Sequence, residues 1–543
     1  MTAKVVLRGW RFQRNKDVNN FLSRQINEIC WMIEIDQDDV RPPAIQCMEE
    51  VDVDKVVKRR LIRLTNLPFP ALSWREDQED SREVVYEERA LVCRWKFVWI
   101  FPDAAARMGR KPWIEQALMR VKAEDCTVLC QKAFAEPDQL RQIFRGETQK
   151  GGMSKKWLFG EKEFLRQELY ADQGKPILSS LTTSTKFWER GDPMQRGRVG
   201  KLICKDELTQ SHTANDSITI NATVSPSLPS SPKKQRYTVL DCFCGGGGWS
   251  RAAVMAGLRV ESGFDFAKEA CETYALNFFG AKVYHLWANE YTQHSKDCHF
   301  DIVLASPPCA PFSPVHTRQG QHDDRNTASL LAIPDLLKKA KPRVMILEQT
   351  AGLINQHKDW FNNLIQNITS VGYSVRWRLL KCADYGLAQP RPRLFIIAAC
   401  PGETLPPFPR PTHSADTTSG LKPWKTINQA IRGIPEEWAD HNVDSCIERN
   451  YTSFCGDKQA NTICTAGQKK QQMYHPSGKR DFTAREFACL QEFPLCHKFG
   501  DVGATNIRTQ IGNAVAPVVG QKMLAEVKRW LMIADGLLDG GQS

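Results

Sequence analysis

The 543-residue sequence has no run of apolar residues near the roughly 18 that a membrane helix requires. Its apolar stretch from Leu394 to Cys400 is far shorter, so we expect no membrane partner. The opening residues carry charges where a signal peptide has its apolar core, which predicts an intracellular protein. The sequence also lacks any Cys-x-x-Cys pair, and its 18 cysteines are not spaced as zinc ligands, so we expect free thiols and no metal.

A strong excess of one charge sign is missing too. The formal net charge is +11, which is compatible with a nucleic-acid partner but common in other proteins. Hydrophobic residues make up 42% of the chain, which allows buried cores and excludes a wholly disordered protein. The length predicts two or three domains.

A polar segment at 206–236 divides the chain: thirteen of its 31 residues are Ser, Thr or Pro, and none is aromatic. Such a segment cannot offset its ordering entropy by burial, so we predict a flexible linker between residues 1–205 and 237–543. In the N-terminal part, residues 90–101 predict a strand and residues 113–123 have helical spacing. We expect this part to form a separate, β-rich domain. By element order and composition it resembles a bromo-adjacent-homology domain, which implies binding of chromatin proteins. A structural domain without a ligand is the alternative.

After the linker, predicted strands alternate with predicted helices. Strands are expected at 237–243, 259–264, 301–305, 344–347 and 393–399, and helices at 250–255 and 267–278. This alternation predicts an α/β fold with a doubly wound, mostly parallel sheet. Ligands of such sheets bind beyond the carboxyl ends of the strands.

The first two predicted strands end in residues suited to an adenosine-containing ligand. The first leads into the glycine-rich turn DCFCGGGGWS at 241–250, which lacks the terminal lysine of a triphosphate loop. The second ends in Asp265 and Phe266, where a carboxylate can accept ribose hydroxyls and a ring can stack on a purine. S-adenosylmethionine has this chemistry. A tight turn beside a surface aspartate is the alternative.

The later strand ends carry a thiol, a carboxyl group and two guanidinium groups. Cys309 follows the third strand in SPPCAPFS, and Glu348 ends the fourth. Arg391 and Arg393 precede the fifth in QPRPR. A thiol is a strong nucleophile once ionised, although most buried cysteines are inert.

From about 237 to 530 the chain resembles a C5-cytosine DNA methyltransferase. The motifs occur in that family's order: DCFCGGGGWS, PPC at 307–309, the glutamate triplet at 348–350, QPRPR, TAREFACLQEFP and QIGNAVAP. The triplet reads Glu-Gln-Thr, where most members have Glu-Asn-Val. This variant resembles a fungal branch linked to repeat-induced point mutation and premeiotic methylation.

The resemblance implies a mechanism and a nuclear location, for genome defence or epigenetic silencing. Cys309 would add to C6 of a cytosine flipped out of DNA, which activates C5 toward the methyl donor. Glu348 would bind N3 with a raised pKa, Arg393 would bind the O2 edge, and Arg391 would support the loop or contact phosphate. The implied S-adenosylmethionine pocket consists of Phe243, Cys244, Gly245, Gly247, Gly248, Asp265, Phe266, Asn289, Pro308, Asn513 and Val515.

Several departures from the family pattern leave other functions open. Ala310-Pro311 replaces the usual Gln-Gly after the cysteine and is stiffer, and Gln349 replaces an asparagine. The target-recognition region expected at 402–480 is short, with a basic cluster at Lys469, Lys470, Lys479 and Arg480 for phosphate contacts. A catalytically weak or inactive chromatin regulator and an RNA cytosine-5 methyltransferase are therefore the alternatives.

Overall fold

The computed structural model describes residues 6–66, 81–125, 134–145, 237–294, 299–312, 323–446, 448, 455–465 and 473–539. Met1–Trp157 and Tyr237–Ser543 belong to one compact unit. The predicted linker at 206–236 lies outside the described residues. In the part of the chain that the structure describes, no helix is long and apolar enough to span a membrane.

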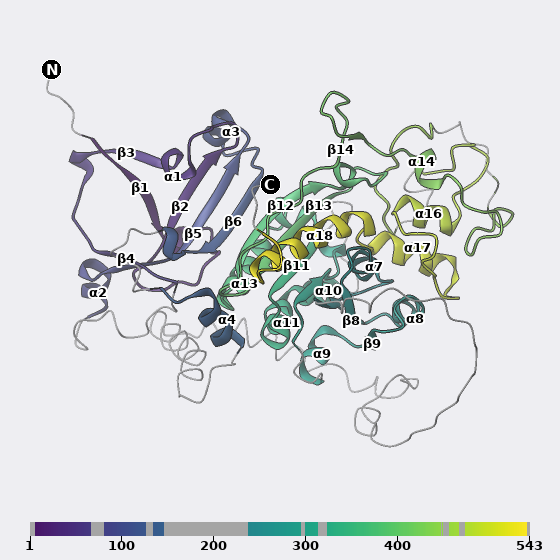
Figure 1. Ribbon diagram of the computed structural model, residues 1–543, viewed down its shortest axis with the longest axis horizontal. Helices are drawn as coiled ribbons and strands as arrows, with labels where there is room; N and C mark the ends of the chain where they lie inside the picture. Colours follow the sequence, from purple (N-terminus) through teal and green to yellow (C-terminus); the bar gives the residue numbers. More distant parts are fainter. Residues whose placement is uncertain are drawn as a thin grey trace. The chain divides into compact units, whose positions relative to one another are not determined.

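The C-terminal part is built on a mixed, mostly parallel sheet. Its strands are β7 (Thr238–Cys242), β8 (Arg259–Asp265), β9 (Lys282–His285), β10 (Ile302–Ala305), β11 (Val344–Thr350), β12 (Ser374–Lys381) and β13 (Pro392–Ala399). They are hydrogen-bonded in the order β12-β13-β11-β10-β7-β8-β9 (Figure 1). Only β13 runs against the others in this series. The predicted α/β fold is confirmed, and the carboxyl ends of β7, β8, β10 and β11 meet at one edge.

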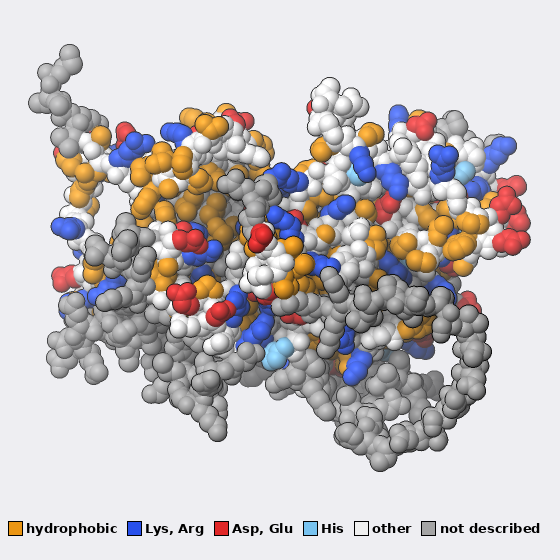
Figure 2. All heavy atoms as spheres, viewed as in Figure 1, with side chains coloured by type: hydrophobic (Ala, Val, Ile, Leu, Met, Phe, Trp, Pro, Cys, Tyr) orange, Lys and Arg blue, Asp and Glu red, His pale blue; other side chains and the backbone are white. Residues whose placement is uncertain are grey.

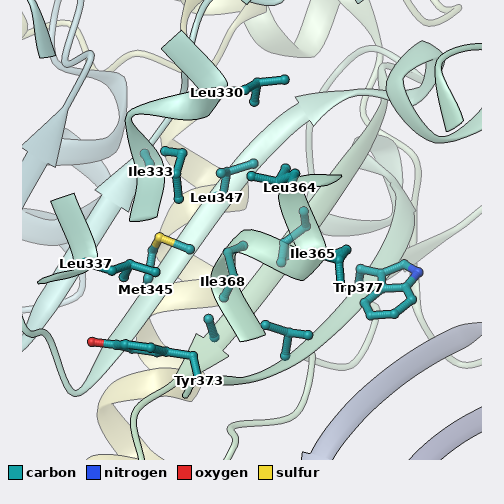
Figure 3. Packing of buried hydrophobic residues seen from close by; sticks show 14 of the residues in the cluster. Leu330, Ile333, Leu337, Met345, Leu347, Leu364, Ile365, Ile368, Tyr373 and Trp377 are labelled. Atoms are coloured by element: carbon teal, nitrogen blue, oxygen red, sulfur yellow. The ribbon is translucent and has the colours of Figure 1, made fainter. Parts of the chain in front are cut away.

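Helices cover both faces of this sheet. They are α7 (Gly248–Met255), α8 (Lys268–Asn277), α9 (Ala288–His294), α10 (Asp323–Leu331), α11 (Ile333–Ala340), α12 (Ala351–Asn355), α13 (Lys358–Ser370) and α18 (Pro517–Ala534). Three further helices, α14 (Ile427–Ile431), α16 (Ala484–Leu490) and α17 (Gly503–Asn513), lie apart from the sheet. Successive residues of β11 point to opposite faces, as the pleat requires. Met345 and Leu347 pack with α10, α11 and α13 (Figure 3), whereas Val344 and Ile346 pack with α7 and α18. The strand is buried on both sides, so its first four residues, Val344 to Leu347, are all apolar.

Short elements follow the sheet in the region after residue 400. They are β14 (His413–Ser414) and β15 (Lys422–Pro423), which pair with each other, and α14. Together with α16 and α17, α14 encloses a separate apolar cluster that includes Ile427, Ile463, Phe487 and Ile511. Thr483 caps α16: its hydroxyl oxygen accepts a hydrogen bond from the backbone N–H of Glu486. In return, the Glu486 carboxylate accepts a hydrogen bond from the backbone N–H of Thr483.

The N-terminal part is rich in strands, as its sequence predicts. Its strands are β1 (Val6–Arg14), β2 (Glu28–Asp36), β3 (Met48–Asp52), β4 (Ile62–Leu64), β5 (Leu91–Phe101) and β6 (Glu115–Arg120), and its helices are α1 (Pro43–Gln46), α2 (Arg82–Glu88), α3 (Ala104–Gly109) and α4 (Pro137–Arg145). The helix expected at 113–123 is wrong, because β6 occupies this stretch. β6 pairs antiparallel with both β5 and β12, so strand pairing on two sides overrides local helical spacing.

The N-terminal part shares its core with the C-terminal part. Phe21 is 3% exposed and lies edge-on against Phe361 and Trp377, and its backbone carbonyl accepts the Thr369 hydroxyl. The indole N–H of Trp377 donates to Gln116. In contrast, apolar side chains are exposed over the N-terminal strands (Figure 2). They include Val6, Leu7, Trp10 and Val51.

Candidate active site

The glycine-rich turn between β7 and α7 is packed tightly on one side and open on the other. A Cβ on Gly248 would lie 2.4 Å from the Val515 carbonyl, so the turn and the NAVAP segment touch. Gly245 and Gly247 have φ of +52° and +89°, which favour glycine. A Cβ on Gly245 would meet nothing within 4 Å. Open space therefore lies beside this backbone.

Asp265 borders the same space at the carboxyl end of β8. One carboxylate oxygen accepts the Gly245 amide at 2.8 Å and the other accepts the Ala267 amide at 2.9 Å. Burial raises the pKa of Asp265, while these amide hydrogen bonds oppose the shift. Each oxygen keeps a second lone pair that can accept a ribose hydroxyl. The next residue, Phe266, is 43% exposed and offers a ring face, so the residues present fit an adenosine group.

Other predicted cofactor residues lie at varied depths around this edge. Phe243 packs edge-on against Phe264, and burial raises the pKa of the Cys244 thiol well above its ordinary value. Val515 is buried, whereas Asn513 at the end of α17 and Asn289 on α9 are exposed. Pro308 is partly buried beside Cys309. The extra residue of NAVAP allows Pro517 to begin α18, where proline's missing N–H is tolerated.

Sequence reasoning missed two residues near the turn. Asp241 is fully buried, and one of its oxygens accepts the amide and hydroxyl of Ser250, while the other has no hydrogen-bond partner among the residues that the structure describes. Burial raises the pKa of Asp241 to about 8. Trp287 stacks on Phe266. The fixed place of Asp241 in the motif could have indicated it, but Trp287 follows β9, a strand that the sequence did not predict.

Cys309 lies directly after β10, next to the short turn η6 (Ala310–Phe312). The thiol is partly buried, and its pKa is raised by burial first and by the negative charge of Glu348 second. Arg393 and Arg391 oppose this shift. One carboxylate and two guanidinium groups therefore act electrostatically on a single thiol.

Glu348 and Arg393 form a buried ion pair beside the thiol. The Nε of Arg393 lies 2.8 Å from Oε1 of Glu348, and both side chains are at most 12% exposed. Antiparallel pairing of β11 with β13 sets Arg393 opposite Thr350, two residues from Glu348. The structure thus brings together three of the residues predicted to be catalytic: Cys309, Glu348 and Arg393.

The Gln-Thr residues of the triplet anchor the loop that carries Cys309. The side-chain amide of Gln349 is fully buried. Its nitrogen donates to the carbonyl of Pro307 at 3.0 Å, and its oxygen accepts a hydrogen bond from the backbone N–H of Thr350 at 2.9 Å. The Thr350 hydroxyl donates to the Phe312 carbonyl at 3.1 Å. The residues on both sides of Cys309 are therefore tied to β11, with glutamine in the place of asparagine.

Arg391 is buried and bonded to backbone on two other segments. Its guanidinium donates to the carbonyl of Ile463 at 2.6 Å and to those of Gly512 and Ala514 at 2.9 and 3.1 Å. It is 2% exposed, and burial together with the charge of Arg393 lowers its pKa to about 10. These contacts favour loop support over phosphate contact.

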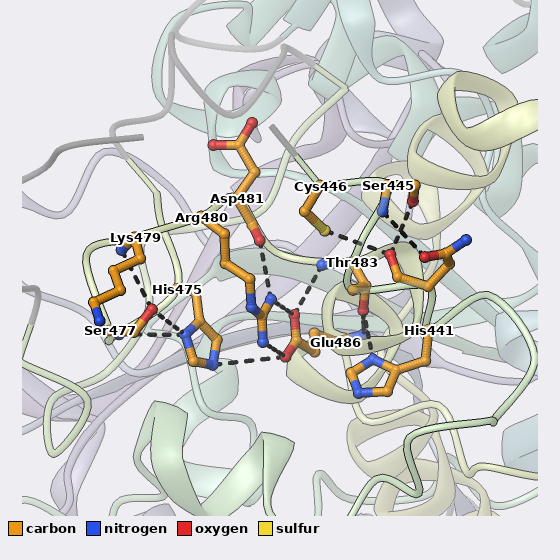
Figure 4. A network of polar contacts seen from close by, with 11 residues as sticks. His441, Ser445, Cys446, His475, Ser477, Lys479, Arg480, Asp481, Thr483 and Glu486 are labelled. Atoms are coloured by element: carbon orange, nitrogen blue, oxygen red, sulfur yellow. Dashed lines mark hydrogen bonds and ion pairs between the residues drawn. The ribbon is translucent and has the colours of Figure 1, made fainter. Parts of the chain in front are cut away.

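The region predicted for target recognition has a polar network at its end. Arg480 donates two hydrogen bonds of 2.7 Å to the Glu486 carboxylate, and His475 lies beside the same carboxylate (Figure 4). Arg480 is therefore occupied within the protein. Lys479 is exposed, and Lys469 and Lys470 lie outside the described residues.

The doubly wound α/β sheet carries three features at adjacent strand ends: a glycine-rich turn, a carboxylate for a ribose and a thiol. Together they define a cofactor-dependent transferase site. The profile of the family described as C-5 cytosine-specific DNA methylase matches residues 237–442 and 407–529, more than half of the chain. The chain belongs to this family, so it is a DNA (cytosine-5) methyltransferase that uses S-adenosylmethionine. The family, the enzyme class and the cofactor predicted from the sequence are confirmed.

Individual relatives match about half of the chain. The Type II methyltransferase M.BsuRI of Bacillus subtilis is 28% identical over 299 residues, which are 49% of this chain and 67% of that protein. M.NgoFVII of Neisseria gonorrhoeae is 28% identical over 332 residues, covering 53% and 85%. Among solved structures, S. pombe Dnmt2 aligns with 56% of this chain and 99% of its own at 16% identity, with a TM-score of 0.40.

Proposed function

We propose that this chain methylates cytosine C5 in DNA through a Cys309 thiolate that adds to C6 of a flipped base. The observation that carries this proposal is the cluster of Cys309 with the Glu348–Arg393 ion pair at adjacent strand ends. S-adenosylmethionine supplies the methyl group. A C6 adduct turns the ring into an enamine, which makes carbon 5 nucleophilic. After methylation of carbon 5, loss of its proton would expel the Cys309 thiolate from C6 and restore the aromatic ring.

The neighbouring residues would then hold the base and the thiol. Glu348 would bind the N3 edge of the cytosine, and Arg393 would bind its O2 edge. This requires the two side chains to lie side by side, and their ion pair of 2.8 Å places them so. The charge of Arg393 favours the thiolate of Cys309. Gln349 and Thr350 would fix the thiol by anchoring both sides of its loop. The hydrogen bonds of Gln349 support an intact loop although the usual asparagine is missing.

The cofactor would lie along the turn at 243–248. Gly245 leaves room beside its backbone, and Asp265 would accept the ribose hydroxyls while Phe266 contacts the adenine. Asn513 and Val515 would close the pocket, since Val515 already touches Gly248. Phe243, Cys244, Gly247, Gly248, Asn289 and Pro308 complete the proposed set.

The biological setting that we propose is nuclear genome defence or epigenetic silencing in the fungal branch named above. The Glu348-Gln349-Thr350 triplet supports this branch, and a DNA substrate in that branch supports the nucleus. Residues 1–205 would form a domain that meets chromatin proteins, 206–236 a linker, and 237–543 the catalytic domain with target recognition at 402–480. Exposed apolar side chains on the N-terminal strands support a protein partner.

Transfer of tritiated methyl groups from S-adenosylmethionine to DNA and to tRNA tests the proposal, beside a binding titration with S-adenosylhomocysteine. We expect label in DNA only, and none in DNA whose cytosines already carry a C5 methyl. Label in tRNA would make the chain an RNA methyltransferase. Binding of cofactor and DNA without transfer would make it a regulator. Cys309→Ser should abolish transfer, and the exposed Cys496, outside the target-recognition region, gives a matched control as Cys496→Ser.

A further inference from the structure

The exposed ring of Phe266, at the carboxyl end of β8, has an aromatic neighbour. It stacks on Trp287 with ring centroids 4.6 Å apart and an angle of 14° between the planes. Neither ring belongs to the buried core: Phe266 is 43% exposed and Trp287 is partly buried. A flat aromatic pair is thus present directly beside the carboxylate of Asp265.

The backbone fixes Trp287 firmly at this position. β9 pairs parallel with β8, which sets His285 opposite Asp265, and the Leu286 amide donates to the Asp265 carbonyl at 3.0 Å. The Trp287 amide donates to the Glu290 carboxylate at 3.0 Å at the start of α9. Trp287 is therefore held by strand pairing and by a helix cap, two residues beyond the strand end.

Phe266 is the freer partner of the two. Exposed side chains change rotamer within picoseconds to nanoseconds, and 43% of the Phe266 side chain is already exposed. A purine between the rings requires their planes to be about 7 Å apart, twice the carbon–carbon contact of about 3.5 Å. A rotation of the Phe266 side chain that moves its ring about 2–3 Å further from Trp287 would open that space.

On the basis of the proposed function, we propose that Trp287 is the second aromatic wall of the adenine site and that the Phe266–Trp287 stack opens to admit the adenine. Closed, each ring shields one face of the other from water. Open, the purine replaces one aromatic stack with two, so the exposed apolar area does not grow. Asp265, next in sequence to Phe266, would accept the ribose hydroxyls at the same moment.

Calorimetric titration of the full chain with S-adenosylhomocysteine and with adenosine tests this proposal. Trp287→Ala should weaken both ligands at least about tenfold, since base–aromatic stacking is removed. Trp287→Phe should stay within about threefold of wild type. Phe279→Ala, which removes an 88% exposed ring from the α8–β9 connection on the other side of β9, should stay within about twofold.

Tryptophan fluorescence supplies a second readout that a merely structural role would not change. Binding of S-adenosylhomocysteine should quench part of the wild-type emission, and this part should be missing in Trp287→Phe although the ligand still binds. Unchanged affinity of a folded Trp287→Ala, or unchanged quenching in Trp287→Phe, would overturn the clamp while leaving the methyltransferase proposal intact. Failure of the wild type to bind S-adenosylhomocysteine would overturn both.

Discussion

Replacing Arg391 by lysine separates two roles that the sequence leaves open for this residue. A phosphate contact needs only a positive charge, which lysine retains. Support of the loops needs donors that reach Ile463 on one side and both Gly512 and Ala514 on the other. The three N–H donors of a lysine ammonium all sit on one nitrogen atom, whereas a guanidinium group carries its N–H donors on three nitrogen atoms in one plane.

The expected loss follows from the hydrogen bonds. Lysine can serve the carbonyls of one segment, which leaves a buried carbonyl on the other without its charged donor. A hydrogen bond to a charged group contributes about 1.5–3 kcal/mol, and a buried unpaired acceptor costs about 1–3 kcal/mol. Since Arg391 is 2% exposed, water cannot replace the donor. We expect Arg391→Lys to lower the free energy of unfolding by about 3 kcal/mol.

Urea denaturation of the full chain measures this loss, and DNA binding as a function of salt measures the alternative. Removing a phosphate contact altogether would reduce the slope of log K against log salt by about 1. For Arg391→Met we therefore expect a lower unfolding midpoint with an unchanged salt slope. A lysine variant as stable as the wild type, together with a reduced slope in Arg391→Met, would refute the supporting role.

Three further changes test other contacts. Gln349→Leu should destabilise the chain by about 2–4 kcal/mol in urea, because the Pro307 carbonyl and the Thr350 amide lose their partner; wild-type stability would contradict this. Phe21→Ala should cost about 3–5 kcal/mol as a core truncation, and a smaller loss would show that the N-terminal part adds little to the shared core. Glu348→Gln removes the negative charge that raises the pKa of Cys309, so alkylation of that thiol, followed by peptide mass spectrometry, should begin at lower pH; a midpoint at higher pH would reverse the assigned sign.

The sheet of the C-terminal part could be predicted because its signals are local. Strands β7, β10, β11 and β13 contain short apolar runs, and these four strands and β8 each lie within a few residues of the predicted position. Parallel strands bring their carboxyl ends to one edge, so the proximity of Cys309 and Glu348 follows from order alone. Arg393 joins them because β13 runs in the opposite direction and begins at that edge.

The remaining features depend on contacts between distant segments. Residues 115–120 have the spacing of a helix, yet β5 and β12 pair with them on both sides. No local pattern indicates that Arg391 bonds to carbonyls more than seventy residues away. Trp287 was missed because its neighbour β9 is only four residues long and partly exposed, so it lacks the continuous apolar run of a central strand.

Trapping on DNA that contains 5-fluorocytosine tests the central claim most directly. Fluorine at C5 cannot leave as a proton does, so a thioether formed at C6 should persist when DNA and S-adenosylmethionine are both present. We predict a covalent protein–DNA adduct that maps to the peptide carrying Cys309, survives in Cys496→Ser and is absent in Cys309→Ser. A Cys309→Ser protein that still forms the adduct, or a wild type that binds DNA and cofactor without forming it, would contradict the account.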